Sequence, residues 1–183
     1  MDLIFYYLAL TYICFIGFKI LLELLVDLFG VLTWRMTPYV PSTDPVCRAM
    51  VEMANLKPGM KVYDLGSGDG RLLLLAAARG AEAVGIEINT YLVVYSKMRA
   101  LRSPFRGKVR VRWGNLWWAR VADADVVFVY LMPYYMAELK RLLERQLKPG
   151  AVVVSNAFVF ENWAPFNEDK DNGVYAYRFP PQA

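Results

Sequence analysis

Apolar residues run almost without interruption through the N-terminal part of the chain. No charged residue occurs between Leu3 and Phe18, and the apolar character continues for four more positions. About 20 such residues form a helix roughly 30 Å long, which matches the hydrocarbon core of a bilayer. Lys19, Glu23 and Asp27 recur every four residues, so they share one helical face. The pattern predicts a transmembrane helix that leaves the hydrocarbon near Lys19.

The residues around this segment indicate its processing and its orientation. A cleaved signal peptide is disfavoured, because Asp2 stands where Lys or Arg is usual and no A-x-A site follows. The alternative is a hydrophobic helix that packs on its own domain or on a partner. Arg35, Arg48, Lys57 and Lys61 follow the segment, and no Lys or Arg precedes it. The positive-inside tendency therefore predicts a single-pass protein with its C-terminal domain on the cytoplasmic side, or on the matrix side of a mitochondrial membrane.

A proline-containing segment separates this helix from the rest of the chain. Thr37–Pro45 holds three prolines and several polar turn formers, which is typical of an ordered linker that leads into a helix. We therefore divide the chain into a membrane helix at 1–33, a linker at 34–44 and one domain at 45–183. A chain of this length accommodates one α/β domain with an appendage but not two full domains.

Strand-like and helix-like patterns alternate in the domain. The strands predicted from apolar, β-branched runs are Lys61–Leu65, Glu82–Glu87, Lys108–Trp113, Asp125–Tyr130 and Ala151–Ser155. The predicted helices are Pro45–Leu56, Arg71–Arg79, Thr90–Arg102 and Tyr134–Leu147. Two final segments, Phe158–Glu161 and Val174–Phe179, would bring the count to seven strands. The alternation predicts an α/β fold, a mostly parallel seven-stranded sheet with helices on both faces.

A glycine-rich turn joins the first predicted strand of the domain to its helix. The run from Asp64 to Arg71 reads DLGSGDGR, and its three glycines clear space between a strand end and a helix start. A dinucleotide fold favours G-x-G-x-x-G, with a pyrophosphate at the helix N-terminus. Here an acid, Asp64, heads the turn, and its carboxylate would repel a phosphate but attract an ammonium group. The turn therefore favours S-adenosyl-L-methionine, which has an amino acid end and no phosphate.

Other strand ends should meet the same ligand, because ligands of open α/β sheets bind beyond the carboxyl ends of the strands. Glu87 ends the second strand and is placed to accept both ribose hydroxyls. Asn115 and Leu116 follow the third strand and are placed to meet the adenine. The aromatic segment Tyr130–Tyr135 follows the fourth strand and suits a substrate entrance.

Each of these residues also has a purely structural alternative. Asp64 can cap the turn, Glu87 can be an ordinary strand-end carboxylate, and Asn115 can be a plain turn residue. Tyr134 and Tyr135 can simply open the next helix. The tryptophans of this region can belong to the core or to an interface; they are Trp113, Trp117 and Trp118.

Composition excludes several kinds of chemistry. The chain has no histidine, which removes the commonest general base and the commonest zinc ligand. Cys14 and Cys47 form neither a metal-spaced pair nor a disulfide framework, so no metal site is expected. The formal charge is +4, but the basic residues look dispersed and no nucleic-acid-binding motif is present. We interpret the charge as favouring a membrane surface, with no nucleic acid partner expected.

The chain resembles the seven-strand (class I) protein lysine methyltransferases, in the group of small archaeal enzymes and membrane-anchored mitochondrial ones that modify the ATP synthase c subunit and the adenine nucleotide translocase. The resemblance covers most of the chain from Tyr39 to about Trp163. Its motifs are Tyr39-Val40-Pro41-Ser42, Asp64 to Arg71, Ala83 to Asn89, Leu92 to Ser96, Asn115-Leu116-Trp117 and Ser155-Asn156-Ala157-Phe158, with Trp163 beyond. The hydrophobic N-terminal segment also looks like the mitochondrial branch.

The resemblance implies a Rossmann-like methyltransferase domain that uses S-adenosyl-L-methionine, with residues 34–44 acting as a segment that gates the cofactor. It implies cofactor contacts from Tyr39, Pro41, Ser42, Asp64, Gly66, Ser67, Gly68, Gly70, Glu87, Ile88, Asn89, Asn115 and Leu116. Two positions depart from the family pattern. Asn115 stands where many relatives have an aspartate, and Ala157 stands where some carry a larger polar or basic residue.

The expected function is methyl transfer to a protein lysine at a membrane. This in-line displacement mainly needs a neutral amine held near the methyl group, so the absence of histidine is no obstacle. An aromatic, poorly hydrated channel would favour the neutral amine. The residues assigned to this channel are Tyr130, Pro133, Tyr134, Asn156 and Phe158. The alternatives are a methyltransferase for a membrane lipid amine or quinone, and a cofactor-binding membrane assembly factor without catalysis.

Overall fold

The computed structural model describes residues 2–34 and 37–181, and within the first helix it describes side chains only at positions 5–22, 24 and 25. The chain divides into two units, Met1–Pro38 and Tyr39–Ala183. Each unit is described by itself. The predicted roles of Arg35, Glu23 and Asp27 concern groups outside the described residues and side chains.

The first unit contains one long helix, α1 (Asp2–Trp34). Its segment Phe5–Leu22 is long and apolar enough to cross a membrane, and none of that segment is buried within the protein. The predicted helix is therefore present. By length and composition alone it can span a bilayer.

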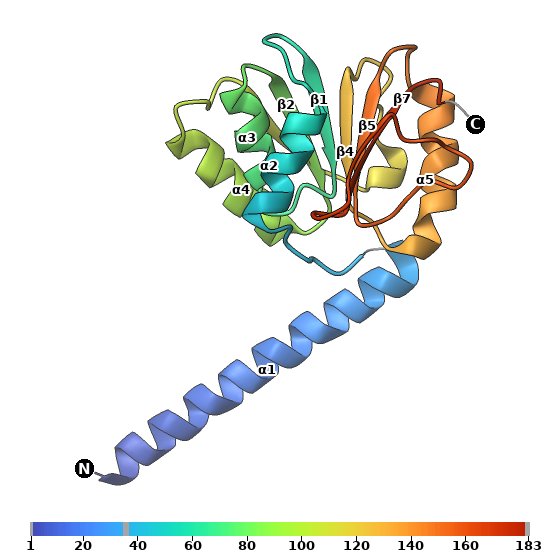
Figure 1. Ribbon diagram of the computed structural model, residues 1–183. Coiled ribbons are helices and arrows are strands. Elements are labelled where there is room, and N and C mark those ends of the chain that lie inside the picture. The colour runs from blue at the N-terminus through green and yellow to red at the C-terminus, as the bar shows by residue number, and fades with distance from the viewer. Residues whose placement is uncertain (1, 35–36, 182–183) are drawn as a thin grey trace. The chain divides into compact units, whose positions relative to one another are not determined.

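The second unit is built on a seven-stranded sheet with the order β3-β2-β1-β4-β5-β7-β6 (Figure 1). The strands are β1 (Lys61–Leu65), β2 (Glu82–Glu87), β3 (Val109–Trp113), β4 (Val126–Val129), β5 (Val152–Asn156), β6 (Asn167–Asp169) and β7 (Val174–Arg178). The first five are parallel, and β7 runs antiparallel to both β5 and β6. The strand order reverses between β1 and β4, which is where open sheets of this kind bind ligands.

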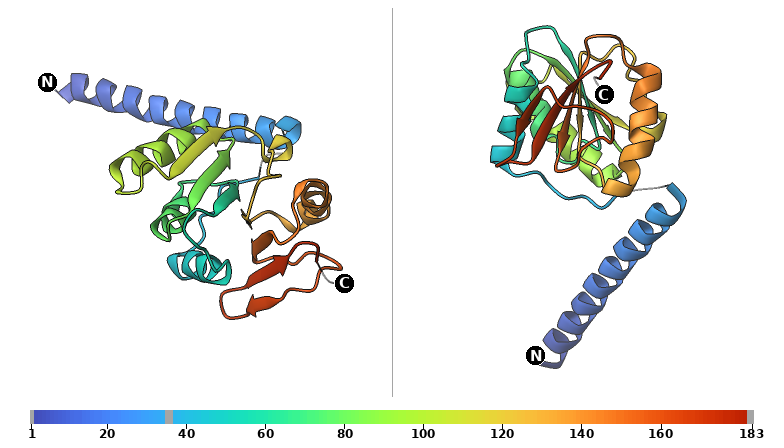
Figure 2. Two further views of the ribbon diagram at one scale, coloured as in Figure 1. Left: turned by 90° about the horizontal axis from the view of Figure 1, so that it is seen from above. Right: turned by 45° about the vertical axis from the view of Figure 1, so that its right-hand side comes forward.

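Helices cover both faces of the sheet. Their bounds are α2 (Asp44–Met53), α3 (Arg71–Ala78), α4 (Thr90–Arg102), the 3₁₀ turn η1 (Leu116–Trp118) and α5 (Pro133–Gln146). Apolar residues of α2, α3 and α4 form one buried layer, and those of α5 and the η1 region form the other. Figure 2 shows the β6–β7 pair, in red, away from α4, which agrees with the strand order. The predicted α/β architecture is confirmed.

One predicted strand is wrong. Phe158–Glu161 was expected to be the sixth strand, but this strand is Asn167–Asp169. Phe160 and Trp163 are buried instead in an aromatic cluster, with ring centroids 5.3 Å and 5.8 Å from Tyr177 of β7. The apolar residues after β5 therefore pack on the core as an irregular segment. The polar strand β6 forms because it pairs with β7, and no hydrophobic pattern in the sequence predicts this pairing.

Candidate active site

The glycine turn lies between β1 and α3 at the point where the strand order reverses. Gly66, Gly68 and Gly70 have φ angles of 88°, 53° and 76°, the left-handed region that glycine enters without strain. The backbone N–H groups of Gly66 and Ser67 donate to the Ile86 carbonyl oxygen at 2.9 Å and 3.1 Å. The turn is thereby attached to β2, and its shape is fixed by backbone hydrogen bonds.

The three glycines serve different purposes. A Cβ at Gly68 would lie 2.5 Å from the Tyr39 ring, and one at Gly70 would lie 2.1 Å from the Ser96 hydroxyl oxygen. These two glycines are required by packing within the protein. A Cβ at Gly66 would meet nothing within 4 Å, and this residue is exposed. Gly66 is therefore where the turn leaves its backbone open to a ligand.

Asp64 presents a buried carboxyl group at the head of the turn. It is 6% exposed, and no hydrogen bond to its carboxyl occurs among the residues that the structure describes. Burial, followed by the nearby charges of Glu87 and Asp69, raises the pKa of Asp64 from 3.8 to about 8. The neighbouring Ser67 hydroxyl is also buried without a partner in this part of the chain. A cationic ammonium group would satisfy this carboxyl, so the site fits the amino acid end of S-adenosylmethionine.

Glu87 is held rigidly at the end of β2. Its two carboxylate oxygens accept hydrogen bonds from the backbone N–H groups of Gly68 and Asn89, both at 2.8 Å. The side chain is buried, with 7% of its surface exposed. Each oxygen retains a further lone pair for a hydroxyl group. Glu87 thus supports the turn and can also accept hydrogen bonds from a ribose.

Two of the residues predicted to contact the cofactor are N-caps of helices in the structure. The Asn89 side-chain oxygen accepts hydrogen bonds from the N–H groups of Tyr91 and Leu92 and begins α4. The Asn115 side-chain oxygen accepts one from Trp117 N–H at 3.0 Å and begins η1, of which Leu116 is the first residue. An asparagine at position 115 keeps this cap, as an aspartate would. The residues before the two caps are also joined, because the Trp113 indole N–H donates to the Ile88 carbonyl at 2.9 Å.

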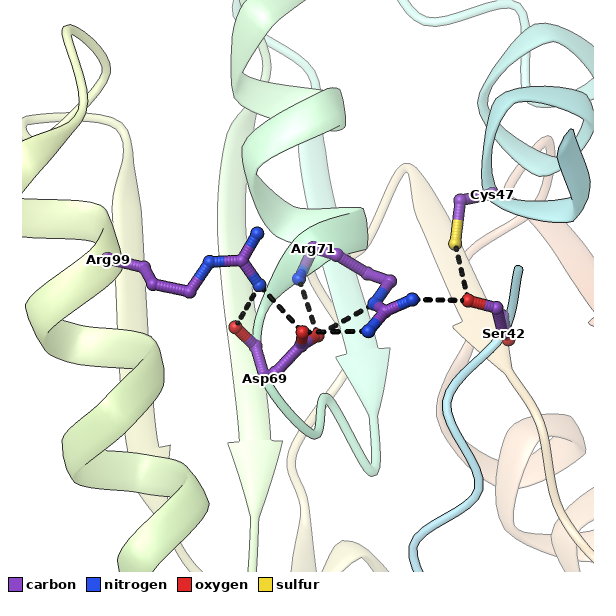
Figure 3. Close-up of polar contacts among 5 residues, drawn as sticks. All are labelled: Ser42, Cys47, Asp69, Arg71 and Arg99. Carbon is purple, nitrogen blue, oxygen red and sulfur yellow. Dashed lines mark hydrogen bonds and ion pairs between the residues drawn. The ribbon is translucent and has the colours of Figure 1, made fainter. Parts of the chain in front are cut away.

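A network of charged groups ties the segment before α2 to the glycine turn (Figure 3). Arg71 forms two side-chain hydrogen bonds with the Asp69 carboxylate, at 3.0 Å and 2.9 Å, and a third with the Ser42 carbonyl at 2.7 Å. Arg99 reaches the same carboxylate from α4 at 2.7 Å. Burial raises the pKa of Asp69, but the hydrogen bonds from Arg71 outweigh it and hold that pKa below its ordinary value.

Residues 39–42, which we call the strap, lie against the cofactor turn. Tyr39 packs on Gly68, and the Ser42 hydroxyl accepts a hydrogen bond from the Asn156 amide at 2.9 Å. Ser42 therefore contacts α3 through its carbonyl and β5 through its side chain. Pro41 is exposed between these contacts. The strap connects the cofactor side of the sheet with the end of β5.

An aromatic pair follows β4 and β5. The rings of Tyr130 and Phe158 are stacked, with centroids 6.5 Å apart and planes 20° apart. Strand register pairs Leu65 with Val129 and Val129 with Ser155, so the next residues in line across the sheet are Gly66, Tyr130 and Asn156. The open part of the cofactor turn, an aromatic ring and a buried amide therefore lie at the carboxyl ends of three neighbouring strands.

Ala157 shapes the backbone at this point. Its φ of 66° is unusual for a residue other than glycine, and its N–H donates to the Gly173 carbonyl at 2.7 Å. The Ser155 hydroxyl donates to the Phe158 carbonyl at 2.6 Å and closes the turn. This turn ends β5 and carries the Phe158 ring next to that of Tyr130.

Pro133 and Tyr134 are the first two residues of α5. Pro133 lines a groove of about 410 Å³ that also contacts Val159. Tyr134 is 65% exposed, and its ring contacts Tyr135, with centroids 4.5 Å apart. Neither residue has a ring contact with the stacked pair in the described structure. Their predicted place in the channel stays a prediction.

Comparison with known proteins identifies the family. Residues 64–167 match the model of the ANTKMT methyltransferase domain, which is more than half of the chain. The chain belongs to this family. It is also 36% identical over 130 residues to a protein-lysine N-methyltransferase of Saccharolobus islandicus, with 70% of this chain and 81% of that protein covered.

Other relatives extend the comparison. The lysine N-methyltransferase of Homo sapiens that is named for the c subunit of ATP synthase is 37% identical over 128 residues, which cover 70% of this chain and 54% of that protein. The chain spans 54% to 62% of the length of the vertebrate relatives with this name. A structure described as an RNA methyltransferase from Salinibacter ruber with S-adenosyl-L-homocysteine has a TM-score of 0.74 and 37% identity, with 79% of this chain and 96% of that chain covered.

These comparisons confirm the class I methyltransferase fold, and S-adenosylmethionine is the cofactor of this domain. The individual cofactor and channel residues stay predictions. Sequence reasoning did not assign a role to Asp69, Arg71 or Arg99. The close spacing of Asp69 and Arg71 in the turn could have suggested their ion pair, whereas Arg99 joins them only through the packing of α4.

Proposed function

We propose that this member of the ANTKMT methyltransferase family is a protein-lysine N-methyltransferase held at a membrane. In this proposal, residues 1–33 anchor the chain, 34–44 link the anchor to the cofactor site, and 45–183 form the catalytic domain. The names of relatives that modify lysines support the reaction class. The observation that carries the proposal is the stacked pair of Tyr130 and Phe158, which follows β4 and β5 at the same end of the sheet as the glycine turn.

The aromatic pair suits a lysine side chain. When bound, the cofactor supplies a methyl group on a positively charged sulfur. A lysine amine has an ordinary pKa of about 10.4 and reacts only when neutral. Tyr130 and Phe158 offer apolar ring faces along which the lysine stem can lie, and a poorly hydrated environment lowers the pKa of the amine. The pair therefore favours the nucleophilic form of the substrate.

Asn156 can orient the amine. Its amide nitrogen donates to the Ser42 hydroxyl, so its amide oxygen is the atom that can accept a hydrogen bond from the lysine. With cofactor bound, the amine so held would take the methyl group from the sulfur, leaving a neutral thioether, and the surplus amine proton would leave to solvent. Positioning supplies most of the catalysis, and no histidine is required. Pro133 and Tyr134 would contact the substrate protein at the substrate entrance.

Membrane attachment rests on α1. Its segment Phe5–Leu22 has a mean hydropathy of 1.8 and is exposed throughout. A single-pass orientation with the domain on the cytoplasmic side, or on the matrix side of a mitochondrial membrane, follows from the positive-inside tendency. Such an anchor confines the enzyme to the plane in which membrane-bound substrates diffuse. The protein partner is accordingly proposed to be a membrane protein that presents a lysine.

The experiment that tests this function follows the methyl group. The full chain is reconstituted in host membranes and incubated with cofactor carrying an isotopic methyl label, and label is measured in the protein, lipid and RNA fractions. Label on protein lysines, located by mass spectrometry, is the expected result. Label in lipid or RNA would replace the proposed substrate class, and cofactor binding without transfer to any fraction would remove the catalytic assignment.

Two variants connect this activity to the site. Tyr130→Ala and Phe158→Ala should each lower turnover at least tenfold while the cofactor still binds, because each removes one wall of the channel. Phe166→Ala is the matched control, since Phe166 is an exposed aromatic residue next to β6. Unchanged turnover in the first two variants would place the channel elsewhere.

A further inference from the structure

Charged residues between Ile88 and Ala122 are all basic. This stretch holds eight Lys and Arg residues and no Asp or Glu, whereas the rest of the chain is net acidic. It folds as α4, the edge strand β3 and η1. The basic residues are therefore concentrated at one edge of the sheet, and the expectation that they are dispersed is wrong. Among the residues described, Arg99 is the one of the eight that pairs with a carboxylate.

Helix α4 also exposes a continuous apolar strip. Its members, 41% to 73% exposed, are Tyr91, Val94, Tyr95, Met98 and Leu101. Their spacing of three and four residues places them on one face of the helix. The opposite face is buried against the sheet. Helix α4 lies at the outer end of the helices on this side (Figure 1), so this strip, which we call the α4 stripe, faces outward.

Basic and aromatic groups surround the stripe. By helical spacing, Lys97 and Arg99 flank it on its two sides, and Arg102 follows it in the last turn. Trp113, at the end of β3, is 59% exposed and donates its indole N–H to the Ile88 carbonyl, just before α4 begins. An apolar strip with basic flanks and aromatic rings is the pattern of helices that lie in the interface of an anionic bilayer.

We propose that the α4 stripe binds the surface of a bilayer that contains anionic lipid. The positive charge complements lipid phosphates, and the aliphatic Val94, Met98 and Leu101 suit acyl chains. The rings of Tyr91, Tyr95 and Trp113 could also stack on the bases of single-stranded nucleic acid, but such a surface would leave the exposed aliphatic side chains of the stripe without a function. The apolar α1 of the same chain would bring the domain to this surface. The proposal concerns lipid contact and does not depend on the substrate of the reaction.

The location of the stripe gives this contact a consequence for the active site. Helix α4 begins directly after Glu87 and Asn89, which border the cofactor turn. Trp113 lies at the same end of the sheet, because β2 and β3 are parallel and Glu87 is in register with Trp113. A domain that rests on α4 would therefore keep the carboxyl ends of β2 and β3 close to the lipid headgroups. Substrate groups that emerge just above the bilayer would be within reach.

The test measures lipid contact at one position of the stripe. The full chain with Cys14→Ser and Met98→Cys is labelled with a fluorophore and reconstituted in phosphatidylcholine vesicles with or without phosphatidylglycerol, with nitroxide on the upper acyl chain as quencher. Label at position 98 should be quenched several-fold more in the anionic vesicles. The matched control carries the label at Arg145→Cys, an exposed position on α5, and should be quenched equally in both.

Charge reversal separates the contribution of the basic residues. Lys97→Glu, Arg102→Glu and Arg106→Glu together should abolish the extra quenching at position 98 and leave cofactor binding unchanged. Equal quenching at positions 98 and 145, or equal quenching in both vesicle types, overturns the proposal. If the label at position 98 were shielded from water but not quenched by lipid, the α4 stripe would be covered by α1 or by a second copy of the chain, and the proposal would be wrong. A label that responds to single-stranded RNA but not to anionic vesicles would assign it to nucleic acid.

Discussion

At the scale of single residues, Asp64 is the group whose chemistry most depends on the fold. Burial and the charges of Glu87 and Asp69 raise its pKa to about 8, so the unliganded carboxyl holds a proton at neutral pH. Binding an ammonium group requires the ionised form, and binding below pH 8 therefore releases a proton. Cofactor affinity should rise with pH and peak near pH 8, since an α-amino group itself loses its proton above about pH 8.

Asp64→Asn checks this prediction. Titration calorimetry should show affinity at least about tenfold weaker, because a hydrogen bond between charged groups is lost, and no rise between pH 6 and pH 8. The unfolding free energy gives a second readout. The native carboxyl keeps a proton that the unfolded chain gives up above its ordinary pKa of 3.8, so the contribution of Asp64 to stability falls as pH rises to about 8. A wild-type affinity that does not change with pH would contradict the assignment.

Alanine substitutions at Gly66 and Gly70 should have different effects, one mainly on cofactor affinity and the other mainly on the stability of the fold. Gly70→Ala adds a methyl group 2.1 Å from the Ser96 hydroxyl oxygen at a φ of 76° and should lower the free energy of unfolding by roughly 2 to 5 kcal/mol. Gly66→Ala adds a methyl group in open space, so only the strain of its positive φ remains, about 1 to 2 kcal/mol. Its main effect should be on cofactor affinity.

Denaturant unfolding measures the stability of both variants, and cofactor titration measures their affinity. Ser96→Gly in the Gly70→Ala background should restore part of the stability, because it removes the clashing hydroxyl. If Gly66→Ala bound cofactor as the wild type does, the open side of Gly66 would not be the ligand side.

At the scale of elements, the strap is attached by Arg71 and Asn156 and by the packing of Tyr39, and Arg71 supplies its link to the charged network. Arg71→Ala removes the hydrogen bonds to the Ser42 carbonyl and the Asp69 carboxylate. Hydrogen bonds to charged groups contribute about 1.5 to 3 kcal/mol, so local opening of residues 39–42 should become roughly 10 to 100 times more frequent. Hydrogen exchange of the strap should accelerate accordingly, and cofactor should dissociate faster.

Arg79→Ala is the matched control at the end of the same helix. The Arg79 guanidinium is exposed and lies 4.0 Å from Glu52, so its loss should leave the strap unchanged. Equal exchange rates in the two variants would show that Arg71 does not hold the strap.

The same scale shows what the sequence predicts and what it does not. The parallel strands are predicted within about a residue or two, because each is a short apolar run between turn residues. The glycine turn and Glu87 are found because a strand, three glycines and an acid form a local pattern. The strand β6 and the pairing of Arg99 with Asp69 depend on partners far along the chain. The run of basic residues from Ile88 to Ala122 is visible in the sequence but was overlooked, and the fold adds that this run forms one edge of the sheet.

At the scale of the whole molecule, the second unit should suffice for cofactor binding, and α1 should be needed only to bring the enzyme to a membrane-bound substrate. Tyr39–Ala183 contains the complete sheet, both buried layers and every predicted cofactor residue. A chain that begins at Thr37 should therefore fold and bind cofactor with unchanged affinity. It should methylate a soluble peptide that carries the substrate lysine as fast as the full chain does. Methylation of the same lysine in a membrane protein should fall about a hundredfold, because α1 no longer raises the effective concentration of the two partners. The measurement compares both substrates with both chains in proteoliposomes. Equal loss on the peptide and on the membrane protein would mean that α1 supports the active site itself, and no loss on either would mean that it does not deliver the enzyme to its substrate.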